Sequence, residues 1–208
     1  DYLCANGTAC AKSITISASN ASYYPGADMM FVKLIFDPQT GHLFGGQIVG
    51  GKGVDKRTDV LGVAIRAKMN VFDLQELELA YAPPFSSAKD PVNMAGYAAG
   101  NIVEGTFRPF FAEALGGLDD SSVLVDVRTD EEFAQGHIPG AIHCELEKMR
   151  GQLDMLPKDK ELIIYCRVGL RGYVAERLLE QKGYKVRNLA GGWLYYEQMM
   201  QDRDRRDV

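Results

Sequence analysis

Residues 161–172, with the sequence E-L-I-I-Y-C-R-V-G-L-R-G, constrain the fold of this chain more than any other segment. The first half is a short, apolar and partly β-branched run, which is typical of a buried strand in a parallel sheet. The strand ends at Cys166, and apolar residues recur at helical spacing over residues 173–182. The sequence therefore predicts a strand that delivers one cysteine to a tight loop at the start of a helix.

This position favours a reactive thiol. The backbone N–H groups and the dipole of a helix N-terminus attract an anion. Arg167 and Arg171 lie close to Cys166 in sequence and would lower the pKa of its thiol further. We therefore predict that Cys166 is a nucleophile at neutral pH, and a packed cysteine at a strand end is the alternative. The loop residues expected to bind the substrate are Arg167, Val168, Gly169 and Leu170.

The length of the loop separates two kinds of chemistry. Phosphatases that use a cysteine thiolate have a C-x5-R loop, which is wide enough to hold a phosphate. Here the arginine falls one position earlier, at Arg171, and Gly172 takes the sixth position after the cysteine. The smaller loop suits a sulfur atom carried on cysteine better than a phosphoryl group. A small phosphate or arsenate enzyme remains the less favoured alternative.

Three further motifs accompany this loop, namely V-D-V-R at 125–128, E-E-F-A-Q-G-H-I-P-G-A at 131–141 and N-L-A-G-G-W at 188–193. With them, residues 118–199 resemble the rhodanese-like domains. The resemblance implies an α/β domain with a mainly parallel sheet, in which Cys166 carries sulfur as a persulfide and Arg171 stabilises it. It also implies that Asp126 and Arg128 support the structure around the active loop.

The first half of the chain has the pattern of an α+β unit with an antiparallel sheet. Its expected strands are residues 13–19, 29–37 and 43–50, and its expected helices are residues 56–69 and 91–104, the second of them capped by Asp90 and begun by Pro91. In the second half we expect strands at 122–127, 141–144, 162–165 and 185–189 and helices at 131–135, 146–156 and 173–182, with a last helix beginning near 191.

Three motifs of the first half support a second resemblance. They are Y-Y-P-G-A at 23–27, G-G-Q-I-V-G-G-K-G-V-D-K-R at 45–57 and Y-A-P-P-F-S-S-A-K-D-P-V-N at 81–93. They resemble the C-terminal dimerisation domain of flavin-dependent pyridine nucleotide-disulfide oxidoreductases. Within that family the resemblance is to the coenzyme A-disulfide reductase and NADH-dependent persulfide reductase branch, some members of which end in a fused rhodanese domain.

This second resemblance implies a homodimer in which Tyr23 and Tyr81 reach the active site of the partner subunit, near the bound thiol. A phenol can hydrogen-bond or protonate a leaving thiolate, and packing in the dimer core is the alternative role. The resemblance also implies FAD, NAD(P)H and coenzyme A for a full-length parent. The G-x-G-x-x-G motifs that bind such dinucleotides are absent here, so we expect this chain alone to bind none of these cofactors.

Composition limits the remaining possibilities. The chain of 208 residues is 46% hydrophobic and 25% charged, which allows two packed domains. A net charge of -5 argues against a nucleic-acid partner. The sequence shows neither a membrane-spanning run nor a signal peptide, so we expect a soluble, cytoplasmic protein. His143 and Cys144 would face opposite sides of a strand, and no metal site is predicted.

Two observations concern the start of the chain. Cys4 and Cys10 flank a turn at Asn6 and Gly7 and could form a disulfide, but we favour thiols because cysteines in cytosolic chains are usually reduced. The sequence begins at Asp1 without methionine, which suggests a fragment of a longer protein or a processed product.

Together, the sequence predicts a dimerisation domain at 1–104, a linker helix at 105–117 and a rhodanese-like domain at 118–208. The expected function is a sulfurtransferase that moves sulfur from a small-molecule donor to a thiol acceptor resembling coenzyme A. The alternative is a non-catalytic module, in which the rhodanese fold supports the dimer or docks a partner.

Overall fold

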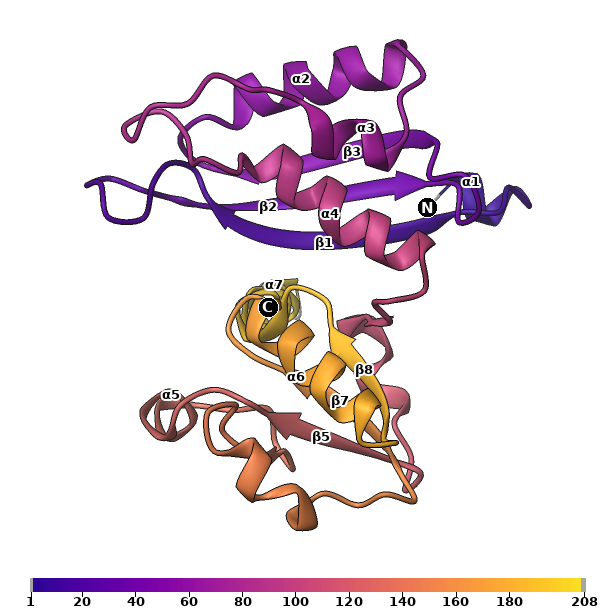
Figure 1. The fold of residues 1–208 in the computed structure, drawn as a ribbon, viewed down its shortest axis with the longest axis vertical. Coiled ribbons are helices and arrows are strands. Elements are labelled where there is room, and N and C mark those ends of the chain that lie inside the picture. The colour runs from indigo at the N-terminus through magenta and orange to yellow at the C-terminus, as the bar shows by residue number, and fades with distance from the viewer. Residues whose placement is uncertain (1, 207–208) are drawn as a thin grey trace. The chain divides into compact units, whose positions relative to one another are not determined.

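The computed structural model describes residues 2–206, and the chain divides after Thr106 into two compact units. The first unit, Asp1–Thr106, contains a three-stranded sheet, and the second, Phe107–Val208, contains a five-stranded sheet. Figure 1 shows both units in the colours of their position along the chain. Each unit is described by itself.

The sheet of the first unit is antiparallel, with the order β1-β2-β3. Its strands are β1 (Ala11–Ala18), β2 (Met29–Phe36) and β3 (Leu43–Gly50). Side chains of the central strand β2 alternate in burial, and Met30, Val32, Leu34 and Phe36 are fully buried. This period of two is expected for a strand with one face on the core.

Three helices cover this sheet, namely α2 (Val54–Arg66), α3 (Val71–Glu76) and α4 (Pro91–Val103) (Figure 1). As the sequence predicts, Asp90 caps α4 and Pro91 occupies its first turn. The structure adds α3, whose six residues are capped by Asn70, and a short helix α1 (Tyr2–Ala5). The predicted antiparallel sheet with helices is confirmed.

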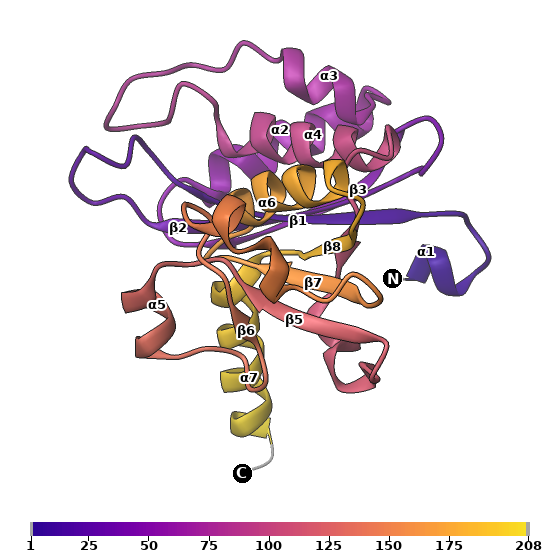
Figure 2. The same cartoon turned by 60° about the horizontal axis from the view of Figure 1, so that its bottom comes forward.

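The second unit has an all-parallel sheet with the order β4-β8-β7-β5-β6. The strands are β4 (Pro109–Phe110), β5 (Ser122–Asp126), β6 (Ile142–His143), β7 (Glu161–Tyr165) and β8 (Lys185–Leu189). The helices are α5 (Asp130–Gln135), α6 (Leu170–Gln181) and α7 (Gly192–Arg206), and Figure 2 shows α6 and α7 on opposite faces of the sheet. Because both faces are covered, β7 is buried along almost its whole length.

Two predicted helices are wrong. Residues 105–117 do not form a linker helix, since β4 joins the edge of the parallel sheet beside β8 and Ala112–Gly117 is a 3-10 helix. Pro109 lacks a backbone N–H donor and two glycines end the segment, which both oppose a continuous α-helix. Residues 146–156 form two short 3-10 helices, Met149–Gly151 and Leu153–Met155, instead of one α-helix. Gly151 interrupts the helical pattern of the sequence.

The preference for reduced cysteines near the start of the chain is also wrong, because Cys10 is disulfide-bonded. The side chain of Cys4 lies outside the described residues. Cys144 and Cys166 are free and buried. Over residues 2–206, the helices are too short or too polar to cross a membrane.

Candidate active site

The cysteine of the site lies at the carboxyl end of the central strand of the second sheet. Strand β7 pairs with β5 on one side and β8 on the other, and Cys166 follows its last residue. In parallel α/β sheets this edge is where ligands bind. The structure thus places Cys166 where the sequence predicts it, at the junction between a buried strand and helix α6.

Gly169 shapes the loop around this cysteine. It precedes α6 with φ 113°, a left-handed backbone conformation that favours glycine. In this conformation the Gly169 N–H donates a hydrogen bond to Cys166 Sγ, with 3.1 Å between nitrogen and sulfur. The sulfur therefore faces at least one backbone donor, although only 1% of the Cys166 surface is exposed. Val168 is half-buried and Leu170 is exposed.

Helix α7 holds the same loop from the other side. The N–H of Trp193 donates to the Cys166 carbonyl oxygen at 2.8 Å, and the N–H of Leu194 donates to the Arg167 carbonyl oxygen at 3.0 Å. Gly192 has φ 58°, and a Cβ at this position would collide with the Cys166 carbonyl oxygen. The close approach of these two segments therefore requires glycine.

Arg171 joins the cysteine loop to helix α5. Its Nη1 and Nη2 atoms donate to the two carboxylate oxygens of Glu132 at 2.6 and 2.7 Å. The hydrogen bond from Arg171 lowers the pKa of Glu132 to about 2. The pKa of Arg171 is raised, first by Glu132 and to a smaller extent by Cys166. The guanidinium thus stays charged between a carboxylate and the thiol.

Glu132 was not predicted as a site residue, although the sequence contains a signal for it. Thr129 and Glu132 form a capping box, in which the Thr129 hydroxyl accepts from the Glu132 N–H and the Glu132 carboxylate accepts from the Thr129 N–H. The T-x-x-E spacing is typical of such a box at the start of a helix. The pairing with Arg171, 39 residues further along the chain, is a tertiary contact.

Asp126 and Arg128 form a buried ion pair next to this loop. Arg128 Nη2 donates to Asp126 Oδ2 and to the Gly136 carbonyl oxygen, each at 2.6 Å. The Arg128 guanidinium also lies over the rings of Trp193 and Tyr165, at 4.8 and 5.7 Å from their centroids. The pair therefore connects β5, the end of α5 and α7.

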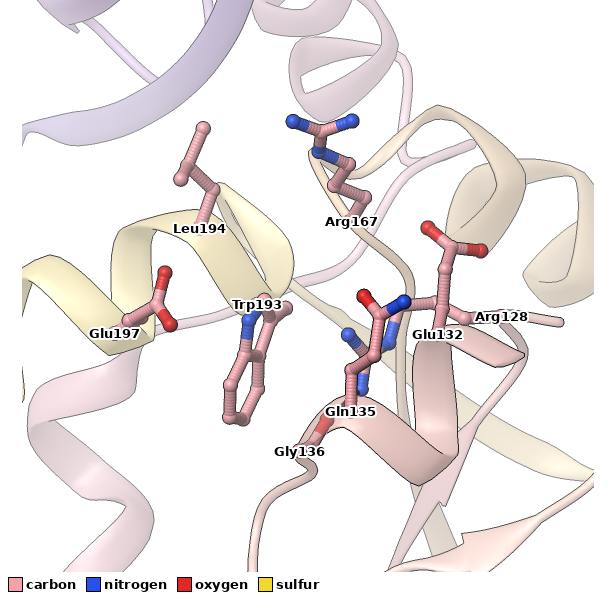
Figure 3. Close-up of a pocket in the computed structure, with 8 residues that line it drawn as sticks. All are labelled: Arg128, Glu132, Gln135, Gly136, Arg167, Trp193, Leu194 and Glu197. Atoms are coloured by element: carbon pink, nitrogen blue, oxygen red, sulfur yellow. Dashed lines mark hydrogen bonds between the residues drawn. The ribbon is translucent and has the colours of Figure 1, made fainter. Parts of the chain in front are cut away.

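A cavity of about 360 Å³ opens between α5 and α7 in the second unit. Its lining residues are Arg128, Glu132, Gln135, Gly136, Arg167, Trp193, Leu194 and Glu197. Figure 3 shows Trp193 between the α7 residues Leu194 and Glu197 and the α5 residues Glu132 and Gln135, with Arg167 projecting from the cysteine loop. Gln135 and Glu197 were not predicted as site residues, and only the motifs at residues 131–141 and 188–193 point to this place.

In the first unit, the structure brings Tyr23 and Tyr81 together. Their hydroxyl oxygens are 3.2 Å apart, although 58 positions separate the two residues in sequence. Their side chains are exposed, with relative exposures of 76% and 49%. The hydrogen bond with Tyr23 raises the pKa of Tyr81. Two phenols that the sequence places in different motifs thus form one exposed pair.

A buried arginine fixes the segment that carries Tyr81. Arg57 on α2 is 1% exposed, and its Nη2 atom donates to Asp90 Oδ2 and to the Ser19 carbonyl oxygen, each at 2.8 Å. Burial alone would raise the pKa of Asp90, but hydrogen bonds from Arg57 and Ser86 lower it below its ordinary value. Arg57 thereby joins the segments before and after the exposed tyrosine pair.

Comparisons with known proteins identify both units. Residues 5–91 match the family model of the pyridine nucleotide-disulphide oxidoreductase dimerisation domain, and residues 111–199 match that of the rhodanese-like domain. The chain therefore consists of a dimerisation domain of the pyridine nucleotide-disulphide oxidoreductase family followed by a rhodanese-like domain. Both predicted resemblances are confirmed.

Three individual relatives show which members of these families the chain is similar to. Coenzyme A disulfide reductase from Staphylococcus haemolyticus is 44% identical over 86 residues, which are 41% of this chain and 20% of that protein. Reduced CoADR-RHD from Bacillus anthracis is 43% identical, with a TM-score of 0.92, and the match covers 97% of this chain and 36% of that one. An NAD-dependent persulfide reductase from A. fulgidus is 35% identical, with a TM-score of 0.81, over 91% of this chain and 34% of that one.

The chain spans about a fifth of the length of the first of these relatives and about a third of each of the two solved structures. What it shares with them is the combination of the two domains found above, which agrees with the coenzyme A disulfide reductase and persulfide reductase branch predicted from the sequence.

Proposed function

We propose that this chain is the dimerisation and sulfur-transfer part of a coenzyme A disulfide or persulfide reductase, with Cys166 as the sulfur carrier. The observation that supports the proposal most directly is the hydrogen bond from the Gly169 N–H to Cys166 Sγ, in a loop shorter than a phosphate-binding one. Arg171, held by Glu132, adds positive charge beside the sulfur.

The proposed reaction needs no external oxidant or reductant. The Cys166 thiolate attacks the outer sulfur of a donor such as thiosulfate, an S–S bond forms, and the donor's own S–S bond breaks as sulfite leaves with the electron pair. The thiolate of the acceptor then attacks the outer sulfur of the Cys166 persulfide, and the Cys166 thiolate departs. Backbone donors and Arg171 stabilise the anionic sulfur at each stage. Arg167, Val168, Gly169 and Leu170 border the reacting sulfur.

In its described residues, the first unit lacks the features of a dinucleotide-binding fold. The first unit has an antiparallel sheet instead of a βαβ unit, and its Gly51-Lys52-Gly53 segment is a turn leading into α2. We therefore propose that FAD and NAD(P)H bind to other parts of a longer parent protein. In that parent, a cytoplasmic homodimer, Tyr23 and Tyr81 would serve a thiol acceptor resembling coenzyme A.

Sulfur transfer from thiosulfate to cyanide tests the proposal. We expect Cys166→Ala to reduce the rate to the uncatalysed level and Cys144→Ala, the matched free and buried cysteine, to leave it within a few-fold of wild type. Transfer retained in Cys166→Ala would reject the assignment.

The near-complete burial of Cys166 is the observation that favours the non-catalytic alternative. A packed, inert thiol would resist a small alkylating reagent, whereas a sulfur carrier would react at pH 7. Mass spectrometry of the Cys166 peptide after brief iodoacetamide treatment distinguishes the two, and an unmodified Cys166 in the folded chain would favour the interaction module.

A further inference from the structure

A buried carboxyl group lies behind the cysteine loop. Glu176 is fully buried on α6, one helical turn after Gly172. Its Oε1 atom accepts a hydrogen bond from the Arg108 N–H at 2.8 Å. Its Oε2 atom is also buried, and within the described residues no donor reaches it. If Glu176 were ionised, one of its two buried, negatively charged oxygen atoms would have no hydrogen bond, which would destabilise the folded state.

Asn188 on β8 also has a buried oxygen atom, Oδ1, without a hydrogen-bond donor among the described residues. Its Nδ2 atom, in contrast, donates to the Gly169 carbonyl oxygen at 3.0 Å. The Asn188 side chain packs against Gly172, where an added Cβ would collide with Oδ1. Asn188 is therefore a direct support of the loop residue that donates to Cys166.

The backbone of one residue ties Glu176 and Asn188 together. The Arg108 N–H donates to Glu176, and the Arg108 carbonyl oxygen accepts from the Asn188 N–H at 3.0 Å. A helical side chain leans towards the N-terminus of its helix, so Glu176 leans towards Gly172 and the Asn188 amide beside it. The two residues that the Arg108 backbone joins thus each carry a buried acceptor without a donor in the described part of the chain, and a single proton on Glu176 that is donated to Asn188 Oδ1 would satisfy both.

We propose that Glu176 is a neutral carboxylic acid that donates its proton to Asn188 Oδ1 and, through Asn188 and Gly169, positions the loop around Cys166. The chain of contacts runs from Glu176 to Asn188, from Asn188 Nδ2 to the Gly169 carbonyl oxygen, and from the Gly169 N–H to Cys166 Sγ. Glu176 is accordingly a positioning residue. The consequence for catalysis rests on the proposed function, whereas the protonation of Glu176 does not.

Some of the charged groups around Glu176 raise its pKa and others lower it. Burial raises the pKa of Glu176 to about 7 from an ordinary value of 4.5, and Glu180 on the same helix adds to the increase. Arg108, before β4, and Arg177, on α6, oppose it. Because the pKa is raised in the folded state, the stabilisation is complete below pH 4.5 and is lost as the pH rises towards 7.

Urea unfolding of the full chain tests the protonation. In Glu176→Gln, the amide N–H replaces the carboxylic O–H and cannot ionise. We expect the ratio of folded to unfolded wild-type protein to fall, relative to that of the variant, by up to about tenfold per pH unit between pH 5 and 7. Glu147→Gln, an exposed carboxylate of the same unit that is not among the groups acting on Glu176, is the control and keeps the wild-type profile in this window. Parallel profiles for wild type and Glu176→Gln would overturn the proposal.

Alkylation of Cys166 tests the positioning and needs no sulfur donor. Breaking the chain in Glu176→Leu or Asn188→Ala should weaken the Gly169 donor to the thiolate and slow iodoacetamide alkylation of Cys166 at pH 6.5 by about threefold to tenfold. Glu176→Gln should restore the wild-type rate, and Cys144 in the same sample reports any general unfolding. Equal rates in Asn188→Ala and wild type, or equal loss in the Leu and Gln variants, would overturn the proposal even where sulfur transfer itself is intact.

Discussion

At the scale of single residues, the ion pair between Arg171 and Glu132 is one of the contacts that hold the cysteine loop. The carboxylate is only partly exposed and accepts two short hydrogen bonds from the guanidinium. A pair of this geometry is worth more than an exposed surface ion pair. Glu132 therefore keeps Arg171 in place beside Cys166, while Arg171 keeps Glu132 ionised.

Glu132→Gln should lower the free energy of unfolding by about 1–3 kcal/mol at pH 7. Because the pKa of Glu132 is lowered to about 2 in the folded state, the stabilisation is complete above its ordinary pKa of 4.5 and declines as the pH falls below it. Urea unfolding at pH 7 and pH 3 should show the difference between wild type and variant shrinking at pH 3. The exposed Glu147→Gln serves as control, and an unchanged difference at pH 3 would contradict the role of the carboxylate.

In the first unit, Arg57 forms a comparable ion pair with Asp90, and this pair is buried. Replacing Arg57 with alanine removes the ion-pair partner that is hydrogen-bonded to the buried Asp90 and leaves only the half-exposed Lys56 at 4.0 Å, so we expect a loss of about 3–5 kcal/mol in the free energy of unfolding. Replacing the exposed Arg66, at the end of the same helix, should cost less than about 0.5 kcal/mol. Chemical denaturation of both variants checks this, and equal losses would show that the buried pair has no special weight.

At the scale of elements, two helical glycines should respond in opposite ways to substitution. A Cβ on Gly96 of α4 would lie 2.8 Å from Leu74 Cβ and 2.9 Å from the Val71 carbonyl oxygen, so α3 and α4 would have to separate. Gly62 of α2 is exposed and has no atom within 4 Å of an added Cβ. We expect Gly96→Ala to destabilise by about 1–3 kcal/mol and Gly62→Ala to stabilise by up to about 1 kcal/mol. Thermal unfolding measures both, and stabilisation by Gly96→Ala would contradict the observed packing.

Most elements could be predicted from the sequence, because their patterns are local. The strand before Cys166 and the cap and proline at the start of α4 are examples, since each depends on neighbouring residues. Helix α3 was missed because six residues are too few to show a helical period. The contacts of the site could not be predicted in this way, because the pairing of Arg171 with Glu132 and the contact between Tyr23 and Tyr81 depend on how distant segments pack.

At the scale of the whole molecule, each unit has its own hydrophobic core. Leu34 belongs to the core of the first unit and Leu179 to one of the two hydrophobic clusters of the second, and both are fully buried. Truncation of either to alanine should cost about 2–5 kcal/mol. By amide hydrogen exchange, we expect Leu34→Ala to lower protection in β1–β3 and Leu179→Ala to lower it in β5, β7 and β8. Loss of protection in both sheets from either variant would contradict independent cores.

The central claim is that Cys166 carries sulfur, and one measurement tests it most directly. The full chain is incubated with thiosulfate, and the peptides containing Cys166 and Cys144 are weighed by mass spectrometry before and after addition of cyanide. We expect the Cys166 peptide alone to gain the mass of one sulfur atom and to lose it to cyanide. A Cys166 peptide of unchanged mass, or sulfur found on Cys144 instead, would contradict the account.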